Sequence, residues 1–362
     1  MKIGIITDSI REKSTGIGYY SKNLIINLLK TDKENKYFFI DYIKNDFNRK
    51  SLILIKNPFQ NFFKTYTWHN TLPFQLRKLD VEFIFNLSGV PHLLNFRQRE
   101  IFVIYDLSAT LFPQFHTWWR VLLNKLLLKR NLKNAYKIVA ISENTQRDIV
   151  KYFKIPEDKI LTIYPSLPPQ AKIEIKPKIP LKTPCILYIG TLEPRKNINL
   201  IIEAFHQLKI KNNFHHQLIL GGKKGWGYSD IFTLVEKLKL EKDVIFTGYV
   251  TEEEKKYLYK HTDLFVYPSF YEGFGLPPLE AMSYGCPVIT SNTSSLPEVV
   301  GNAAIQINPN NVTELYGAIK EVIENDKLRK KMITEGYKQA KKFSQVESLK
   351  ELEKSLFKII SN

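Results

Sequence analysis

The stretch "LFVYPSFYEGFGLPPLEAMSYGCPVIT", from Leu264 to Thr290, decides the fold. It begins with a short apolar run typical of a buried strand and continues into a loop that contains two glycines. Pro277 and Pro278 suit the first turn of a helix, where a missing N–H costs little, and Gly285 suits the position just beyond its end. The apolar run "PVIT" then predicts the next strand. A strand, a helix and a second strand in this order indicate one unit of a parallel sheet.

The same alternation extends through both halves of the chain. Strand-like runs such as "KIGIIT", "KYFFIDYI", "FIFNLS", "IFVIYDLS" and "KIVAIS" alternate with helical patterns in the first half, and "CILYIGT", "QLILGG" and "VIFTGY" do so in the second. Between the halves, "YPSLPPQAKIEIKPKIPLKTP" is rich in proline and lysine and has no helical period, which is typical of a linker. The final segment, from "TELYGAIK" to "SLFKII", has a helical pattern throughout.

We therefore expect an α/β protein with two Rossmann-like, doubly wound domains that face each other across a cleft. A length of 362 residues suits two domains. The predicted divisions are a first domain at 1–165, a linker at 166–183, a second domain at 184–340 and a C-terminal helix at 341–362.

Composition limits the class of protein. A hydrophobic content of 44% and a charged content of 25% are typical of a folded globular chain. Only two cysteines occur, Cys185 and Cys286, so we expect no disulfide framework and an intracellular location. We expect neither a signal peptide nor a membrane-spanning segment. The net charge of +17, with an excess of 12 in residues 1–175 and of 5 in residues 176–362, suits an anionic partner or a lysine-rich solubilising surface.

Two glutamates flank the glycine-containing loop of the opening stretch. Glu272 lies before the predicted helix start and Glu280 lies on the predicted first turn after it. The glycines let the backbone approach a ligand, and a helix N-terminus offers free N–H groups to phosphate. A nucleotide sugar has hydroxyls at both ends and a diphosphate in the middle. One carboxylate could therefore hold the sugar, and the other could hold the ribose.

These residues carry a resemblance to a known family. The run "YPSFYEGFGLPPLEAMSYGCPVITSNTSSLPEVVGNAA", with "YIGTLEPRKN" and "FTGYVTEEEKKYLYKHTDLFV" before it, resembles the donor domain of retaining glycosyltransferases of family 4. These enzymes have the GT-B fold. The resemblance covers essentially the whole chain and is much stronger after residue 180. It implies donor binding at 184–340, acceptor binding at 1–165, and a C-terminal helix that packs back on the first domain.

The resemblance also assigns roles to residues of the second half. Glu272 would hold the transferred sugar and Glu280 the ribose hydroxyls, while Arg195 and Lys196 would neutralise the donor diphosphate. A guanidinium fork and a point cation after a strand are chemically suited to phosphate. The other donor-binding positions implied by the resemblance are Gly190, Tyr249, Val250, Phe274, Gly275 and Leu276. For Tyr249 and Val250, placed near the nucleobase, ordinary packing is an alternative.

In the first half, "STGIGYYSKNL" resembles the family's N-terminal glycine loop, in which Gly16 and Gly18 would let the backbone approach the donor phosphate. Tyr105 and Asp106 fall where many members have His-Asp. The family's histidine contacts the donor sugar, so the tyrosine leaves sugar recognition open. Asp106 would either align the acceptor or cap its own loop.

A helical segment of the first half is suited to contact with a membrane surface. Alternatively, it is a core helix whose basic face is exposed to solvent. In "HTWWRVLLNKLLLKR", Trp118 and Trp119 stand beside several basic residues, a combination found at anionic membrane interfaces. The acceptor that fits such a segment is a glycan, for example one linked to polyprenyl diphosphate. The corresponding location is the cytoplasm, with association of the enzyme with the inner face of the cell membrane.

The expected function is a retaining, metal-independent transfer of a hexose from a nucleoside-diphosphate sugar to a glycan or lipid-linked hydroxyl. The sequence contains no Asp-x-Asp motif and no His/Cys ligand cluster, and we expect no cofactor. Mannose from GDP-mannose is favoured over UDP-hexoses, and cell-surface polysaccharide synthesis is the expected context. A sugar-nucleotide epimerase of the same fold and a nucleotide-sugar binder without transferase activity are the alternatives. A nucleic-acid binder has no supporting motif.

Overall fold

The computed structural model describes residues 1–10, 16–42, 52–55, 64–178, 184–212, 214–347 and 355. The chain divides into two compact units, Met1–Ser166 with Gln345–Asn362, and Leu167–Ser344. Ser14 and Thr15 of the predicted glycine loop, part of the predicted linker and most of the predicted helix at 341–362 lie outside the described residues.

The first unit contains a seven-stranded parallel sheet in the order β3-β2-β1-β4-β5-β6-β7. Its strands are β1 (Lys2–Ile6), β2 (Lys36–Asp41), β3 (Leu52–Leu54), β4 (Phe83–Asn86), β5 (Arg99–Ile104), β6 (Lys137–Ala140) and β7 (Ile160–Thr162). The strand order reverses direction between β1 and β4. In doubly wound sheets ligands bind at such a switch point, outside the carboxyl ends of the strands.

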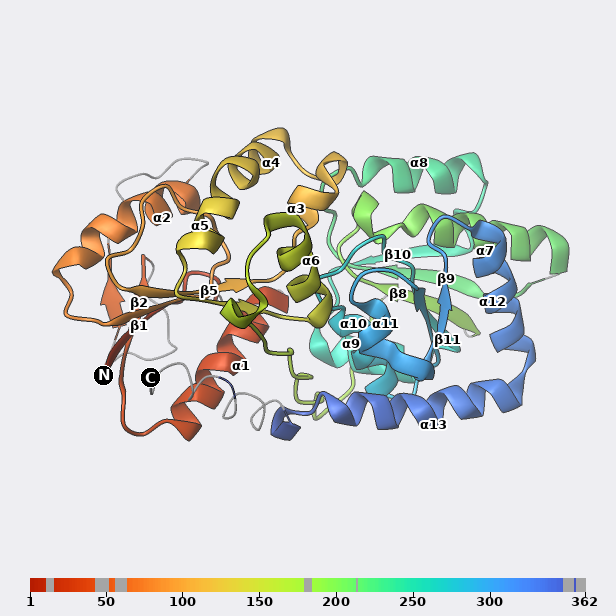
Figure 1. The fold of residues 1–362 in the computed structure, drawn as a ribbon. Coiled ribbons are helices and arrows are strands. Elements are labelled where there is room, and N and C mark those ends of the chain that lie inside the picture. Colours follow the sequence, from red (N-terminus) through yellow and green to blue (C-terminus); the bar gives the residue numbers. More distant parts are fainter. Residues whose placement is uncertain are drawn as a thin grey trace. The chain divides into compact units, whose positions relative to one another are not determined.

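Helices cover both faces of this sheet, with α1 on one face and α2 and α5 on the other (Figure 1). They are α1 (Gly16–Thr31), α2 (Lys64–Gln75), α3 (Ser108–Leu111), α4 (Trp118–Leu123), the π-helical turn η3 (Asn124–Leu128), α5 (Lys129–Asn134) and α6 (Glu143–Phe153). The Ser142 hydroxyl caps α6 by accepting a hydrogen bond from the Thr145 N–H at 3.0 Å. The sequence did not indicate β3, α2 or β7.

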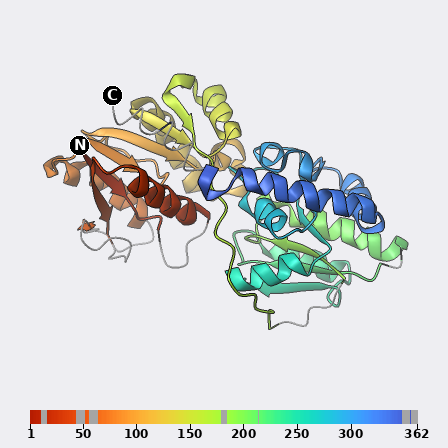
Figure 2. The same cartoon turned by 90° about the horizontal axis from the view of Figure 1, so that it is seen from below.

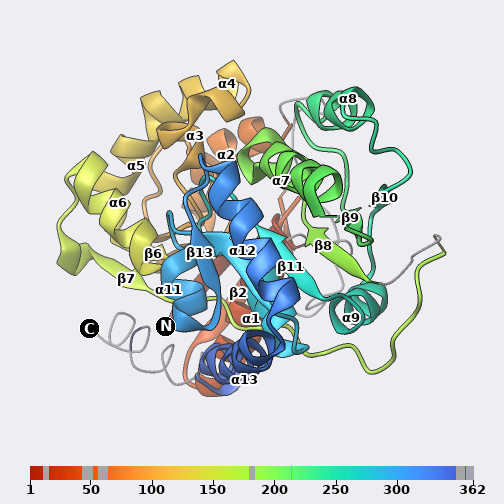
Figure 3. The same cartoon turned by 90° about the vertical axis from the view of Figure 1, so that its right-hand side faces the viewer.

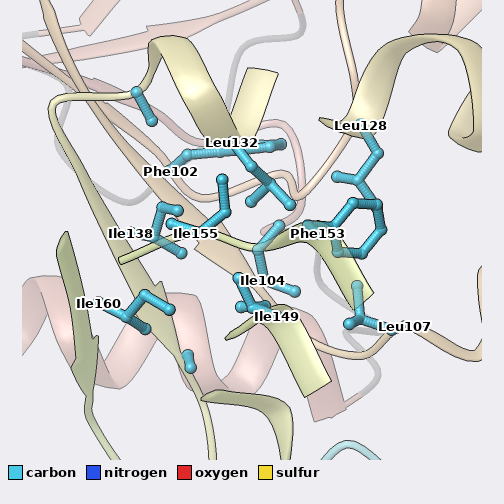
Figure 4. Packing of buried hydrophobic residues seen from close by; sticks show 12 residues of the cluster. Phe102, Ile104, Leu107, Leu128, Leu132, Ile138, Ile149, Phe153, Ile155 and Ile160 are labelled. Atoms are coloured by element: carbon cyan, nitrogen blue, oxygen red, sulfur yellow. The ribbon is translucent and has the colours of Figure 1, made fainter. Parts of the chain in front are cut away.

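Part of the core of the first unit lies between β5, β6 and the helices that follow them. Phe102 and Ile104 of β5 pack with Leu132 of α5 and Ile149 and Phe153 of α6 (Figure 4). These aliphatic and aromatic side chains are buried, so the hydrophobic effect fixes α5 and α6 against the sheet.

The second unit has a six-stranded parallel sheet in the order β10-β9-β8-β11-β12-β13. Its strands are β8 (Cys185–Ile189), β9 (Gln217–Gly221), β10 (Val244–Gly248), β11 (Leu264–Tyr267), β12 (Val288–Ser291) and β13 (Ile305–Ile307). All of them coincide with predicted strand runs, which for β13 is the strand-like run "AAIQIN". Here the order reverses between β8 and β11, so the loops after these two strands define the switch point.

The helices of the second unit lie on both faces of its sheet (Figure 3). They are α7 (Ile198–Asn212), α8 (Ser229–Lys237), α9 (Glu252–Lys260), α10 (Leu276–Ser283), α11 (Leu296–Val300), α12 (Val312–Glu324) and α13 (Asp326–Lys342). The long helix α13 packs against α10 and α12 (Figure 2). The prediction of one uninterrupted helical segment here was wrong. The chain leaves helical geometry at Asn325, whose side chain caps α13 by accepting from the Leu328 N–H at 3.0 Å.

The described part of the predicted linker, residues 166–178, contains no helix or strand. Its beginning is attached to the end of α10, because the Gln170 amide donates to the Ser283 carbonyl at 2.8 Å and the Ala171 N–H donates to the Tyr284 hydroxyl at 3.2 Å. Within the described part of the chain, no helix has the length and apolar character needed to cross a bilayer.

Candidate functional site

The loop between β11 and α10 depends on glycine at its end. Gly275 caps α10 with a φ of 103°, and a Cβ atom there would come within 2.7 Å of the Leu296 side chain. Pro277 and Pro278 occupy the first turn of the helix, as predicted. At the other end, Gly285 has a φ of 78°, and the Cys286 N–H bonds back to the Ala281 carbonyl in a Schellman arrangement.

The switch point of the second unit brings three of the predicted catalytic residues together. Glu272 follows β11, and Arg195 and Lys196 follow β8 in a short 3₁₀ turn, Pro194–Lys196. The Lys196 Nζ lies 2.6 Å from Glu272 Oε1, and the Arg195 Nη1 lies 3.2 Å from Glu272 Oε2. One carboxylate therefore faces two cations at the position where a doubly wound sheet binds its ligand.

Glu272, Arg195 and Lys196 form a charged triad, and neighbouring groups hold its two cations in place. The Arg195 guanidinium also donates to the Tyr271 carbonyl at 2.6 Å and to Glu193 at 2.7 Å. The Lys196 ammonium donates to the Tyr267 hydroxyl at 2.8 Å. Since each partner comes from a different loop or strand end, the triad has little rotational freedom.

Two serines hold the backbone around Glu272. The Glu272 N–H donates to the Ser294 hydroxyl at 2.9 Å, while the Ser295 hydroxyl donates to the Glu272 carbonyl at 2.9 Å and to the Phe274 carbonyl at 2.7 Å. Both serines belong to the segment between β12 and α11. This segment therefore sets the course of the loop that carries the carboxylate.

Burial and charge act against each other on the pKa values of the triad. Burial of the Glu272 carboxyl would raise its pKa, but the charges of Lys196 and Arg195 outweigh this and lower the pKa to about 2. Burial lowers the pKa of Lys196. The charge of Glu272 acts in the opposite direction, but the repulsion of Arg195 adds to the effect of burial, so the pKa stays below its usual value. Glu272 is thus ionised at neutral pH and held by two cations.

Glu280 lies on the second turn of α10 rather than the first, because the helix begins at Leu276. Its carboxylate lies 3.0 Å from the Lys255 ammonium of α9 and accepts from the Tyr259 hydroxyl at 3.2 Å. Burial would lower the pKa of Lys255, but the charges of Glu280 and Glu252 raise it. Glu280 therefore has a cationic partner of its own, separate from the triad.

The remaining predicted donor residues differ in exposure. Tyr249 is 54% exposed and its ring lies below the Lys223 ammonium, whereas Val250 is buried. Gly190 follows β8, and its carbonyl oxygen lies against Gly222. A Cβ atom on Gly222 would come within 1.8 Å of this oxygen. Phe274 is buried, and Leu276 is the first residue of α10.

The predicted residues of the first unit come from the start of α1, the loop after β5 and the start of α4. Gly16 is the exposed first residue of α1, and Gly18, two residues later, is buried. The Tyr105 hydroxyl is buried and bonds to Ser21 at 2.8 Å. The Asp106 carboxylate accepts from the Ser108 N–H at 2.8 Å and from its hydroxyl at 2.6 Å, which is the loop-capping alternative.

Trp118 and Trp119 begin α4, and only the first is freely exposed. Trp118 is 76% exposed, and Leu122 and Leu126, four and eight residues later, are 44% and 63% exposed. Trp119 is half-buried. The segment between Asp106 and Glu143 contains no acidic residue. Its basic residues are Arg120, Lys125, Lys129, Arg130, Lys133 and Lys137.

Sequence reasoning missed several residues of these sites. Tyr267, Ser294 and Ser295 lie in motifs that resembled the family, but the sequence gave no sign that their hydroxyls contact the triad or its loop. The pairing of Lys255 with Glu280 joins residues 25 positions apart. No sequence spacing predicts such a pair. Among the described residues, no three or more His, Cys, Asp and Glu side chains are grouped so that they could hold a metal ion.

Comparison with known proteins identifies the class. The family described as "Glycosyl transferases group 1" matches residues 169–339. The O-antigen chain mannosyltransferase B of Escherichia coli is 34% identical over 95% of this chain and 96% of its own length. The chain therefore belongs to the glycosyl transferases of group 1, and it is a glycosyltransferase, as the resemblance predicted.

Solved structures support the fold. Sucrose-phosphate synthase from Thermosynechococcus elongatus superposes with a TM-score of 0.77 at 19% identity, covering 100% of this chain and 99% of the other. HepE of Anabaena, solved in complex with UDP-glucose, superposes with a TM-score of 0.72 at 16% identity, covering 99% of this chain and 100% of the other. The predicted GT-B fold, with two Rossmann-like units, is confirmed.

Proposed function

We propose that the protein transfers a hexose, with retention of anomeric configuration and without a metal ion, from a nucleoside-diphosphate sugar to a hydroxyl of a glycan. The observation that carries this proposal is the triad of Glu272, Arg195 and Lys196 at the switch point of the second unit. The leaving group of such a transfer is a diphosphate, so the main catalytic need is to stabilise developing negative charge.

The triad supplies the required charges in a compact arrangement. Arg195 and Lys196 would stabilise the departing diphosphate, together with the backbone N–H groups at the start of α10 after Gly275. Glu272 would accept hydrogen bonds from the transferred sugar and hold both cations in place until the donor arrives. We assign Glu272 a positioning role toward the sugar and not that of a nucleophile.

We propose mannose from GDP-mannose as the donor. The support is the E. coli relative, which is named a mannosyltransferase and matches this chain over nearly all of both lengths. The HepE structure was solved with UDP-glucose, so the fold also accommodates a uridine donor. Glu280, fixed by Lys255, would bind the ribose hydroxyls, and the exposed ring of Tyr249 would face the nucleobase.

The acceptor would be a glycan of cell-surface polysaccharide synthesis, in free or polyprenyl-linked form. The relative that acts on the O-antigen chain supports this class. The exposed side chains of Trp118, Leu122 and Leu126 recur at intervals of four residues. They lie in a segment, 107–142, that contains six Lys and Arg residues and no Asp or Glu. We propose that this face rests on an anionic membrane surface at the cytoplasmic side.

Donor turnover is the experiment that tests the transferase proposal. Purified protein is incubated with EDTA and GDP-mannose, UDP-glucose, UDP-galactose or UDP-N-acetylglucosamine, each with and without mannose-terminated saccharides. Release of nucleoside diphosphate from one donor, lost in Glu272→Gln, is the expected result. Epimerised donor without diphosphate release would instead support the epimerase alternative. Turnover only after a divalent cation is restored would contradict metal independence.

Membrane association is tested by co-sedimentation with vesicles of phosphatidylcholine, with and without phosphatidylglycerol. Binding that needs the anionic lipid and weakens with salt is expected, and Trp118→Ala with Leu126→Ser should reduce it. Ile210→Ser, which changes an equally exposed apolar residue of α7 in the other unit, is the matched control. Equal binding to both vesicle types would contradict the proposal.

A further inference from the structure

A buried histidine–carboxylate pair lies at the switch point of the first unit. Asp8 follows β1, one of the two strands between which the sheet order reverses, and His69 lies on α2. The His69 Nε2 lies 3.0 Å from Asp8 Oδ2. The side chain of His69 is fully buried, and that of Asp8 is 4% exposed. The pair occupies the topological position in which the second unit carries its triad.

The pair is incomplete among the described residues. Asp8 Oδ1 and His69 Nδ1 are both buried, and neither has a hydrogen-bond partner in the part of the chain that the structure describes. Buried polar atoms are almost always satisfied, so two orphaned atoms on one ion pair need an explanation. A carboxylate only accepts, and in the tautomer that donates to it from Nε2, Nδ1 is left as an acceptor. The pair therefore offers two acceptors and no donor.

A hydrogen-bonded run of hydroxyl groups begins next to Asp8 in the chain. The Ser9 hydroxyl donates to Ser21 at 3.0 Å, the Ser21 hydroxyl lies 2.8 Å from that of Tyr105, and the Tyr105 hydroxyl donates to the Leu87 carbonyl at 2.7 Å. Leu87 directly follows β4, the other strand of the switch point. Burial raises the pKa of Tyr105, and the charge of nearby Asp8 adds to this effect. The surroundings are thus polar and contain no cation among these groups.

A second buried pair in the same unit shows what a purely structural pair looks like. The His92 Nε2 lies 3.0 Å from Glu100 Oε1, and both side chains are buried. Here the other ring nitrogen, Nδ1, lies 2.6 Å from the Leu94 carbonyl, and the Asn86 amide donates to Glu100 at 2.8 Å. Each polar side-chain atom of this pair has a hydrogen-bond partner, in contrast to the Asp8–His69 pair.

We propose that Asp8 and His69 bind a hydroxyl-bearing saccharide, the acceptor of the transfer reaction. This inference rests on the proposed function. Two acceptors with no cation beside them among the described residues suit a ligand that brings hydrogen-bond donors, as a neutral sugar does, and they would repel a phosphate. The lipid diphosphate of a polyprenyl-linked acceptor would consequently lie away from this pair. Asp8 and His69 are positioning residues for the acceptor and take no part in donor cleavage.

The test separates acceptor use from donor use. Wild type, Asp8→Asn, His69→Gln and the control His92→Gln are compared with the donor that the enzyme turns over, using methyl α-mannoside and α-linked mannobiose as probe acceptors. Donor hydrolysis without saccharide is measured in parallel. We expect both switch-point variants to raise the KM for the saccharide at least tenfold. Donor hydrolysis should stay within about twofold of wild type, and so should both readouts in His92→Gln, whatever its thermal stability.

Several outcomes would overturn the inference. An unchanged saccharide KM in Asp8→Asn and His69→Gln would do so, and so would equal losses of hydrolysis and transfer. Hydrolysis by wild type that no probe saccharide converts into transfer would exclude a neutral sugar site of this kind. A rise in melting temperature on adding Mg²⁺ or Mn²⁺ that is lost in Asp8→Asn would assign the pair to a cation. Absence of any donor turnover in wild type would instead contradict the proposed function itself.

Discussion

The two units share one topology but carry opposite chemistry at their switch points. In the second unit, Arg195 and Lys196 converge on Glu272, and every charge has a partner within 3.2 Å. In the first unit, Asp8 and His69 leave two buried acceptors without a partner among the described residues. The doubly wound sheet provides the position in both cases, and the side chains decide what binds there. A cationic position suits an anionic leaving group, whereas an acceptor-only position suits a neutral sugar.

Removal of the Glu272 charge should have the largest effect. Glu272→Gln keeps the shape of the side chain but no longer balances two cations or holds the sugar. We expect donor turnover to fall about a thousandfold, or roughly 4 kcal/mol of transition-state stabilisation. Both hydrolysis and transfer should be lost, in contrast to Asp8→Asn. Glu335→Gln, on the surface of the same unit, is the control, and a loss of less than tenfold in Glu272→Gln would contradict this role.

The same carboxylate should make the second unit sensitive to acid. Its pKa is lowered from 4.5 to about 2 in the folded chain, so its ionised form stabilises the fold above the unfolded pKa. This contribution is lost as the pH falls from about 4.5 through 2 and amounts to roughly 3 kcal/mol at most. Urea unfolding at several pH values should therefore show a steeper acid loss in wild type than in Glu272→Gln. Parallel curves for the two proteins would refute the ion pair.

Replacement of the guanidinium tests whether the cations act by geometry as well as by charge. Arg195 donates to Tyr271 and Glu272 from Nη1 and to Glu193 from Nη2, and the compact ammonium of a lysine cannot reproduce the spread of this planar fork. Arg195→Lys should lower donor turnover about a hundredfold, equivalent to roughly 2.7 kcal/mol. The control is Arg329→Lys, which changes a surface pair of α13. If Arg195→Lys retained most of its activity, charge alone would explain the role of Arg195.

The backbone conformation at Gly275 requires glycine, whereas that of a glycine within an ordinary helix does not. Gly275→Ala places a side chain at a φ of 103° and against Leu296, so it should destabilise the unit by about 2 kcal/mol and lower donor turnover. Gly317→Ala, in the exposed middle of α12 with open space around it, should stabilise by about 0.5–1 kcal/mol. Denaturant midpoints measure both. A neutral Gly275→Ala would show that the loop can relax.

The donor side of this comparison was largely predictable from sequence, because its signals are local. The prolines and glycines around α10 fixed the ends of that helix, and the strand runs fixed the sheet. Glu272 and Arg195 were found through motifs that lie at strand ends. The break at Asn325 was missed because both flanking segments have helical patterns, and the capping contact by which Asn325 begins the second helix has no distinct signal in the sequence.

The acceptor side was not predictable, because its pair is formed by tertiary contacts. Asp8 and His69 are 61 positions apart, and α2 gave no clear helical pattern. His69 in "YTWHNTL" has no neighbour in sequence that indicates a carboxylate partner. Orphaned atoms, moreover, become visible only when every other partner has been placed.

The smallest effect should come from the partner of Glu280. Lys255→Met removes the cation that fixes this carboxylate but leaves Tyr259 and the helix in place. If Glu280 binds the ribose, the KM for the donor should rise about fivefold with kcat nearly unchanged, because ribose contacts are the same in the ground and transition states. Lys256→Met is the matched control, since its ammonium donates to the Ala171 and Lys172 carbonyls instead. A fall in kcat at constant KM would indicate that Glu280 stabilises the transition state, as the triad does. The proposed difference between the triad and the ribose contact would then not hold.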